Sequence, residues 1–362
     1  MTPGRPASRP RVPVIALTGY LGAGKTTLLN HLLRTPGARL GCVINDFGDI
    51  NVDAALVSGE VDEPASVAGG CLCCMPDAGG LETALERLTA ARADLDAILI
   101  EASGLAEPPN LVRLLRSAAS RRVRYAGLID VVDAVNDART IGGAPPARYG
   151  AATLVVVAKT DLLDAGERRR ALARVAGRAR ARNPRALVVE ADHGRIDPLL
   201  VMDVAQEAAP PGELPLAELT RTARAEAHGG HRHAHADCLT VPAALPVSPG
   251  ALADLLERPP VDAYRLKGVL DVAGSAGRPG PPEPSDGARR VVVNVVAGQV
   301  HLETARPARP ARPAEPGLVA IGTRLGDDVR AALEEALRPA REPPSPSDLA
   351  RLDRIRRRSR GI

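Results

Sequence analysis

One eight-residue segment near the start of the chain limits its possible folds more than any other feature. Residues 19–26 read GYLGAGKT, which fits the pattern G-x-x-x-x-G-K-[ST] in full. The apolar run VPVIALTG leads into it and the helical pattern KTTLLNHLLR follows it. Such a loop turns backbone N–H groups around phosphate oxygens, and the start of the helix adds its positive end. The sequence therefore predicts a strand–loop–helix unit that binds the phosphates of a nucleotide, rather than a glycine-rich turn that binds nothing.

Residues in this loop and at the end of the strand pattern at 98–101 are expected to bind the phosphates and a Mg²⁺ ion. Lys25 is expected to reach the β- and γ-phosphates, and the Thr26 hydroxyl to bind Mg²⁺. The strand pattern ILIE ends in Glu101, whose carboxylate is expected to join the Mg²⁺ shell or to orient water, and Gly104 leaves room for its backbone N–H to approach the γ-phosphate. The expected nucleotide contacts in the loop are Gly19, Gly22, Ala23, Gly24, Lys25, Thr26 and Thr27.

A second short pattern indicates which base the nucleotide carries. Ala158-Lys159-Thr160-Asp161 directly follows the apolar run TLVVV. In GTPases an Asp at this place accepts hydrogen bonds from guanine, and the Lys lies over the base. The motif usually begins with Asn, so Ala158 is expected to weaken the site by about 0.5–1.5 kcal/mol, the net value of one hydrogen bond. Asp161 still favours guanine.

The rest of the first 210 residues alternates apolar runs with amphipathic stretches. Near-continuous apolar strands that alternate with helices predict an α/β fold with a mostly parallel sheet covered by helices on both faces. Strands are expected at 13–19, 40–46, 96–104, 125–134, 152–161 and 186–191, and helices at 25–34, 81–93, 110–120, 167–183 and 198–208.

The composition shifts after residue 210 and again near residue 338. We expect a disordered tail at 1–11, a nucleotide-binding domain at 12–210, a His-rich linker at 211–237, a smaller α+β domain at 238–338 and a solvated basic tail at 339–362. Short strands and the helical pattern DDVRAALEEAL define the smaller domain.

Composition narrows the possible partners and the compartment. Aromatic residues make up 1% of the chain and the net charge is +4, which argues against a nucleic-acid platform that stacks bases. There is no run of 18 apolar residues, and the first 30 residues lack the apolar centre of a signal peptide. We therefore expect a cytoplasmic protein without a membrane partner.

Three of the five cysteines are gathered in residues 70–74, which read GCLCC. Thiolates are soft ligands that suit Zn²⁺ or Cu(I), and three of them leave one coordination position open. Cys71, Cys73 and Cys74 are therefore predicted metal ligands; buried thiols, a redox pair and a capping turn are the alternatives. Cys42 lies within an expected strand and is assigned to the core.

The linker carries a second candidate metal segment. His231, His233 and His235 alternate with other residues, a spacing that can hold a labile metal ion, whereas a polar unstructured linker is the alternative. His31, His193 and His301 carry no comparable signal.

Taken together, these segments resemble the CobW-type metallochaperone GTPases, relatives of the nickel-insertion GTPases of hydrogenase and urease. The matching segments are GYLGAGKTTLLNHLL (19–33), INDFGDINVD (44–53), GGCLCC (69–74), EASGLAEP (101–108), LIDVVDA (128–134) and AKTDLL (158–163). The resemblance implies GTP and GDP as ligands, Mg²⁺ as cofactor, a transition metal as cargo, and a client metalloprotein. Thiolate and imidazole ligands favour zinc as that metal. It further implies a first switch at 45–53, in which Asp46, Asp49 and Asp53 contact a metal, and a second switch at 101–104.

Other interpretations remain open at this stage. The cargo can be cobalt for cobalamin synthesis, or cobalt or iron for a nitrile hydratase. The chain can also serve as a zinc store or sensor, or be a P-loop kinase whose cysteines have no metal role. Neither a water-positioning glutamine nor an arginine finger is evident, so slow intrinsic hydrolysis is expected.

Overall fold

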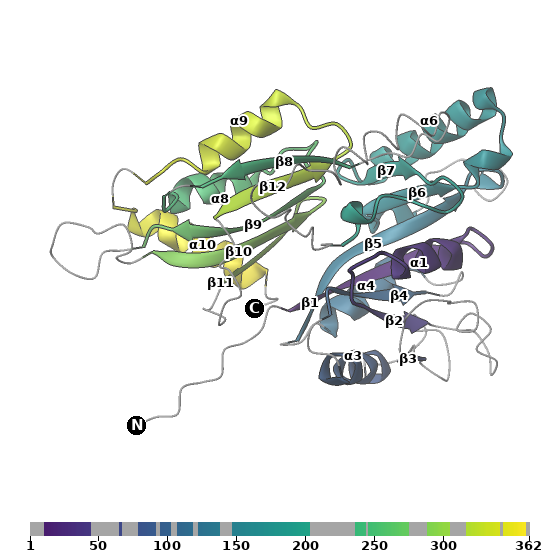
Figure 1. Ribbon diagram of the computed structural model, residues 1–362, viewed down its shortest axis with the longest axis horizontal. Helices are drawn as coiled ribbons and strands as arrows, with labels where there is room; N and C mark the ends of the chain where they lie inside the picture. The colour runs from purple at the N-terminus through teal and green to yellow at the C-terminus, as the bar shows by residue number, and fades with distance from the viewer. Residues whose placement is uncertain are drawn as a thin grey trace.

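The protein forms two β-sheets that lie side by side (Figure 1). The computed structural model describes residues 11–44, 65–66, 79–91, 95–102, 107–118, 122–137, 147–202, 236–243, 245–274, 288–304, 316–340 and 343–359. Within these residues, no helix is long and apolar enough to cross a membrane.

The first sheet has seven strands, and all of its strand pairs are parallel. Its order is β3-β2-β4-β1-β5-β6-β7, which places β1 in the middle between β4 and β5. The strands are β1 (Val12–Gly19), β2 (Leu40–Ile44), β3 (Ala65–Ser66), β4 (Ala97–Glu101), β5 (Val123–Asp133), β6 (Leu154–Ala158) and β7 (Leu187–Glu190).

Helices cover both faces of this sheet, as the continuous apolar strands predict. In β1, Val14 and Ala16 face the core that α3, α4 and α6 complete, whereas Ile15 and Leu17 face the core that contains α1. These helices are α1 (Lys25–Leu33), α3 (Gly79–Ala91), α4 (Pro108–Ser117) and α6 (Ala165–Arg182), with short 3₁₀ turns η2 (Ala147–Gly150), η3 (Thr160–Leu162) and η4 (Pro198–Leu200). The predicted α/β class is confirmed. Of the helix expected at 198–208, the structure describes only the turn η4 and the two residues after it.

The second sheet is antiparallel and has five strands in the order β11-β10-β9-β12-β8. Its strands are β8 (Asp237–Pro242), β9 (Arg265–Val272), β10 (Arg289–Val296), β11 (Gln299–Thr304) and β12 (Gly317–Gly322). Three helices share its apolar core: α8 (Pro249–Glu257), α9 (Asp327–Ala336) and α10 (Pro346–Arg358). The smaller α+β unit expected from the sequence therefore has a core of its own.

Helix α10 differs from the solvated basic tail expected at 339–362. Ser345 caps it by accepting a hydrogen bond from the Asp348 N–H at 3.1 Å, and Leu352 is buried in the core of the second sheet. Arg351 binds Asp254 at 2.8 Å and Glu257 at 2.7 Å on α8. The many arginines of this segment predict a solvated tail, whereas its apolar side chains pack the helix against the core of the second sheet.

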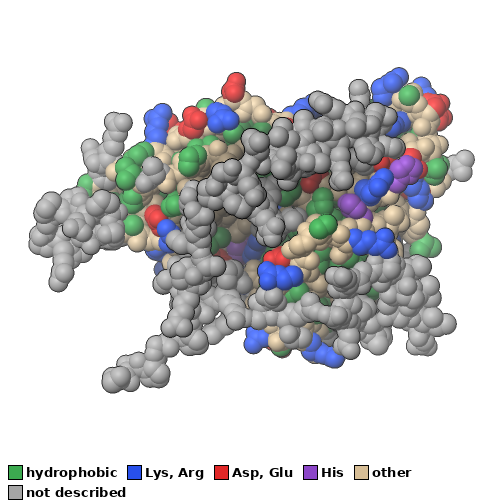
Figure 2. Space-filling view, in the orientation of Figure 1, with side chains coloured by type: hydrophobic (Ala, Val, Ile, Leu, Met, Phe, Trp, Pro, Cys, Tyr) green, Lys and Arg blue, Asp and Glu red, His purple; other side chains and the backbone are tan. Residues whose placement is uncertain are grey.

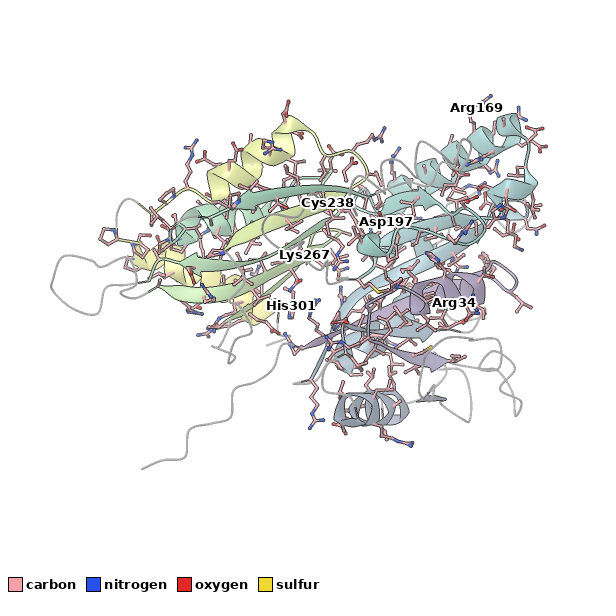
Figure 3. All side chains as sticks on the ribbon, in the orientation of Figure 1. Arg34, Arg169, Asp197, Cys238, Lys267 and His301 are labelled. Atoms are coloured by element: carbon pink, nitrogen blue, oxygen red, sulfur yellow. The ribbon has the colours of Figure 1, made fainter. Side chains whose placement is uncertain are left out.

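The two sheets contact each other through both apolar and charged groups. Tyr264 and Ile321, from the second sheet's side, belong to the same core as helix α1. Arg11, next to β1, binds Glu303 at 2.7 Å, and its Nη2 lies 2.9 Å from Nε2 of His301, which is labelled in Figure 3. Although burial opposes it, hydrogen bonds from His301 and Arg11 lower the pKa of Glu303 to about 2. On the surface in Figure 2, Lys and Arg side chains occur at several separate places rather than in one patch.

Candidate functional site

The phosphate-binding loop joins the end of β1 to the start of α1, and its backbone needs glycine at defined points. Gly19, Gly22 and Gly24 have positive φ angles of 154°, 73° and 103°, which L side chains rarely adopt. A Cβ atom on Gly19 would lie 2.5 Å from the carbonyl oxygen of Val131 on β5. The loop can therefore follow this path only because these positions carry no side chain.

The side chains that follow the loop converge on the end of a neighbouring strand. The Thr26 hydroxyl donates to Oε1 of Glu101 at 2.8 Å, and Glu101 ends β4 in register with Leu17 of β1. Lys25 is 8% exposed, and its Nζ donates to the backbone oxygens of Gly19 at 3.2 Å and Tyr20 at 3.3 Å. Because β1 and β4 are adjacent and parallel, their carboxyl ends bring all of these groups to one edge of the sheet.

This donor set fits the Mg²⁺ ion that the sequence implies. Mg²⁺ prefers oxygen ligands and usually binds proteins through one or two of them, with phosphates and water completing its shell. The Thr26 hydroxyl and the Glu101 carboxylate are 2.8 Å apart, and Glu101 is 3% exposed. Both oxygens stand beside the phosphate loop, so they are the residues that would hold the ion.

The predicted base-recognition loop lies on the other side of β1, after β6. Ala158 is 4% exposed, and a Cβ on Gly24 would lie 3.8 Å from its side chain, so Ala158 lies next to the phosphate loop. Lys159 has φ 61°, and its Nζ binds Oδ2 of Asp133 at 2.8 Å. Although burial opposes it, hydrogen bonds from Lys159 and Asn136 lower the pKa of Asp133. The structure thus brings the two predicted halves of a nucleotide site together.

A buried ion pair beneath the phosphate loop was not foreseen from the sequence. Asp130 is fully buried in β5; Arg148 binds it through both carboxylate oxygens, at 2.6 and 2.9 Å, and Thr18 donates to it at 3.0 Å. Burial raises the pKa of Asp130, and Arg148 opposes the rise. The Arg148 guanidinium also lies 4.2 Å from the centre of the Tyr20 ring, so the pair supports the loop from below. The position of Asp130 within the apolar run LIDVVDA is the feature of the sequence that could have indicated a buried, paired carboxylate.

His193 is a further residue of the site that the sequence did not predict. Its Nδ1 lies 3.4 Å from Oδ2 of Asp161, the residue predicted to accept hydrogen bonds from the base. The two residues come from different loops, after β7 and β6 respectively. No local pattern links them, so the contact is visible only in the folded chain.

Several predicted site residues lie outside the residues that the structure describes. These are Gly104, Asp46, Asp49, Asp53, Cys71, Cys73, Cys74, His231, His233 and His235. Among the described residues, no group of three or more His, Cys, Asp or Glu side chains is arranged to hold a metal ion. Cys42 is fully buried, and burial together with the nearby Glu101 raises the pKa of its thiol to about 12, which confirms that it belongs to the core.

Comparison with known proteins identifies two family regions. Residues 13–190 match the CobW/HypB/UreG nucleotide-binding domain, and residues 237–341 match the cobalamin synthesis protein CobW C-terminal domain.

Curated relatives match the same parts of the chain. A zinc chaperone CobW from Sinorhizobium sp is 31% identical over 314 residues, which cover 77% of this chain and 86% of the relative. The zinc chaperone YjiA of Escherichia coli is 34% identical over 196 residues, covering 51% of this chain and 59% of the relative. The zinc-regulated GTPase metalloprotein activator 1 of Schizosaccharomyces pombe is 32% identical over 201 residues, covering 51% and 47%. The last two matches span about half the length of those relatives.

Proposed function

The chain belongs to the CobW/HypB/UreG family, and from that premise we propose that it is a GTPase that carries zinc and delivers it to a client metalloprotein. One observation supports the nucleotide half of this proposal above the others. The Thr26–Glu101 pair, Lys25 and the loop that carries Asp161 stand at the same edge of one parallel sheet. Ligands of open parallel sheets bind at the carboxyl ends of the strands.

The residues of the site divide the work of holding GTP. Backbone N–H groups of the phosphate loop and the start of α1 receive the phosphates. Lys25 exchanges the backbone oxygens of Gly19 and Tyr20 for phosphate oxygens. Asp161 accepts hydrogen bonds from the N1–H and amino group of guanine, with Lys159 over the base. Adenine has neither donor in that place, so the same carboxylate disfavours ATP.

Thr26 and Glu101 would hold the Mg²⁺ ion that accompanies the nucleotide. When bound there, the ion would supply positive charge that offsets the charge of the β- and γ-phosphates during hydrolysis. The Glu101 carboxylate, at the end of β4, fixes the Thr26 hydroxyl in the direction of the phosphates through the 2.8 Å hydrogen bond. Loss of either oxygen therefore lowers hydrolysis more than it lowers nucleotide binding.

Cys71, Cys73 and Cys74 bind the zinc, with Asp46, Asp49 or the linker residues His231, His233 and His235 as the source of a further ligand. The names of the relatives, which are zinc chaperones, support zinc over cobalt or iron. In the sequence, the cysteines lie between the two proposed switch segments, 45–53 and 101–104. A change from GTP to GDP therefore changes zinc affinity if those segments change with it. Free thiolates need a reducing compartment, so the cytoplasm is the location we propose.

Separate loss of the two activities tests the proposal. Lys25→Ala is expected to lower GTP hydrolysis at least 100-fold and to leave zinc affinity intact. Cys73→Ala is expected to lower zinc affinity at least tenfold and to leave GTP affinity intact. Both are measured on the full-length chain, by phosphate release and by competition with a chromophoric zinc chelator. If either variant abolished both activities while remaining folded, two separable sites would be the wrong description.

A matched variant tests the choice of base. Asp161→Asn replaces an acceptor with a side chain that also donates, so it is expected to lower GTP affinity at least tenfold and to raise the affinity for xanthosine triphosphate. Equal use of ATP and GTP by the unmodified protein would argue instead for a kinase-like or non-specific nucleotide site.

A further inference from the structure

We propose that His193 determines guanine specificity by positioning Asp161, in place of the Asn side chain that position 158 lacks. This inference rests on the proposed role of Asp161 in guanine recognition. His193 is a positioning residue here, since the structure shows it beside Asp161.

The imidazole of His193 is held between two carboxylates from different parts of the chain. Its Nδ1 lies 3.4 Å from Oδ2 of Asp161, and its Nε2 lies 3.7 Å from Oδ1 of Asp192. Asp192 is itself held by Arg195, whose Nη2 lies 3.5 Å from Oδ2. Each ring nitrogen therefore lies near a carboxylate oxygen, and Nδ1 lies beside the residue proposed to bind the base.

The turn that carries His193 has a backbone built for this placement. His193 and Gly194 have φ angles of 48° and 75°, and the backbone N–H groups of Asp192 and Arg195 each donate to the other residue's carbonyl oxygen, at 3.0 and 2.9 Å. A left-handed conformation is strained for a histidine, which carries a Cβ atom. Such strain persists where the surrounding structure fixes it, and it is concentrated at sites that bind ligands.

Contact with α1 ties this turn to the phosphate loop. A Cβ on Gly194 would lie 2.5 Å from Cγ2 of Thr27, the residue after the Mg²⁺ ligand Thr26. In addition, the Thr160 hydroxyl donates to the carbonyl oxygen of Ala191 at 3.4 Å, which joins the turn to the base loop. The turn that carries His193 thus lies between α1 and the base loop, and the His193 side chain is 56% exposed.

Because residue 158 is Ala instead of the usual Asn, another residue has to position the base loop. An Asn there would place an amide beside the backbone of Gly24 and tie the base loop to the phosphate loop. The Ala158 side chain next to Gly24 is a methyl group, which cannot donate or accept a hydrogen bond. The imidazole of His193 supplies a polar contact to the same loop at Asp161.

The test compares GTP with inosine triphosphate, which lacks the guanine amino group, and with ATP. In His193→Ala, we expect KM for GTP to rise about three- to tenfold, the equivalent of one net hydrogen bond, with kcat unchanged. KM for inosine triphosphate should rise less, because Asp161 then has one donor fewer to align with. His193→Asn, which tolerates the left-handed backbone and can still donate to Asp161, should restore most of the GTP preference.

Arg169→Ala is the control, because it removes an exposed side chain of α6 in the same domain and leaves the turn that carries His193 unchanged; it should leave the GTP preference within twofold. An equal rise in KM for all three nucleotides in His193→Ala, or an unchanged ratio of GTP to inosine triphosphate, overturns the inference. If Asp161→Asn itself left the preference for GTP unchanged, the role of Asp161 would fail instead, so the two failures are distinguishable.

Discussion

The phosphate end and the base end of the nucleotide site lie at the same edge of one parallel sheet, with β5 between the strands that lead into them, yet they are constructed differently. The phosphate end lies in one continuous segment, where Gly19 and Gly24 shape the backbone and Lys25 is buried. The base end is assembled from loops that follow β6 and β7, where the exposed His193 meets Asp161. A site that depends on the backbone of one continuous segment can be recognised from a local sequence motif. A site that depends on contacts between separate loops leaves no such motif.

The largest expected effect lies under the phosphate end. Arg148→Met leaves the fully buried Asp130 without its charge partner, so unfolding free energy should fall by about 3–5 kcal/mol. Urea denaturation measures this loss. The double variant Asp130→Asn with Arg148→Met removes both charges and should recover most of it. A loss below about 1 kcal/mol in the single variant would show that the loop does not depend on this pair.

A pair of glycine substitutions separates close packing from backbone strain in the phosphate loop. Gly19→Ala combines a positive φ with a Cβ 2.5 Å from the Val131 oxygen, so we expect a loss of about 2–4 kcal/mol. At Gly22 the φ is also positive, but the Cβ meets no atom within 4 Å. Gly22→Ala should therefore cost about 1 kcal/mol. Equal losses in thermal unfolding would mean that close packing against β5 plays no part.

At the base end, a substitution should strengthen the site. Ala158→Asn adds an amide beside Gly24 and should tighten GTP binding by about 0.5–1.5 kcal/mol, which calorimetric titration can resolve. ATP affinity should stay unchanged, because the gain depends on an ordered base loop that accepts guanine. A gain of the same size for ATP would place the effect at the phosphates and would remove the distinction between the two ends.

The smallest effect concerns acid stability at the base end. Hydrogen bonds from Lys159 and Asn136 lower the pKa of Asp133 although burial opposes them. Its contribution to stability is therefore complete above the ordinary pKa and is lost as the pH falls through the lowered one. Asp133→Asn should flatten this acid-limb loss by less than about 1 kcal/mol, since the pair is partly exposed. An unchanged pH profile of thermal unfolding would show that the pair does not stabilise the loop.

Sequence patterns predicted the parts of the fold that depend on local physics. The parallel sheet and the phosphate loop follow from apolar runs and from one motif that requires glycine, whereas the central place of β1 is known only from the structure. Cys42 was assigned to the core because it lies within an apolar strand, and it is fully buried.

The remaining features depend on contacts between distant segments. Asp130 and Arg148 neutralise each other only after folding, and His193 reaches Asp161 only when β6 and β7 pair. The arginines of helix α10 outnumber its apolar residues and predict a tail, although Leu352 packs the helix against the second sheet. In each case the sequence shows a charged or polar residue, but the distant residue that it contacts is known only from the structure.

Zinc affinity measured in three nucleotide states tests the proposed function most directly. A chromophoric chelator competes for Zn²⁺ with the full-length protein in the absence of nucleotide, with Mg²⁺–GDP, and with a Mg²⁺–GTP analogue. A zinc-delivering GTPase predicts one tight site whose affinity differs at least fivefold between the GDP and GTP-analogue states, a difference that Cys73→Ala removes. The same affinity in all three states, with several weakly bound ions, would contradict it and would indicate a zinc store.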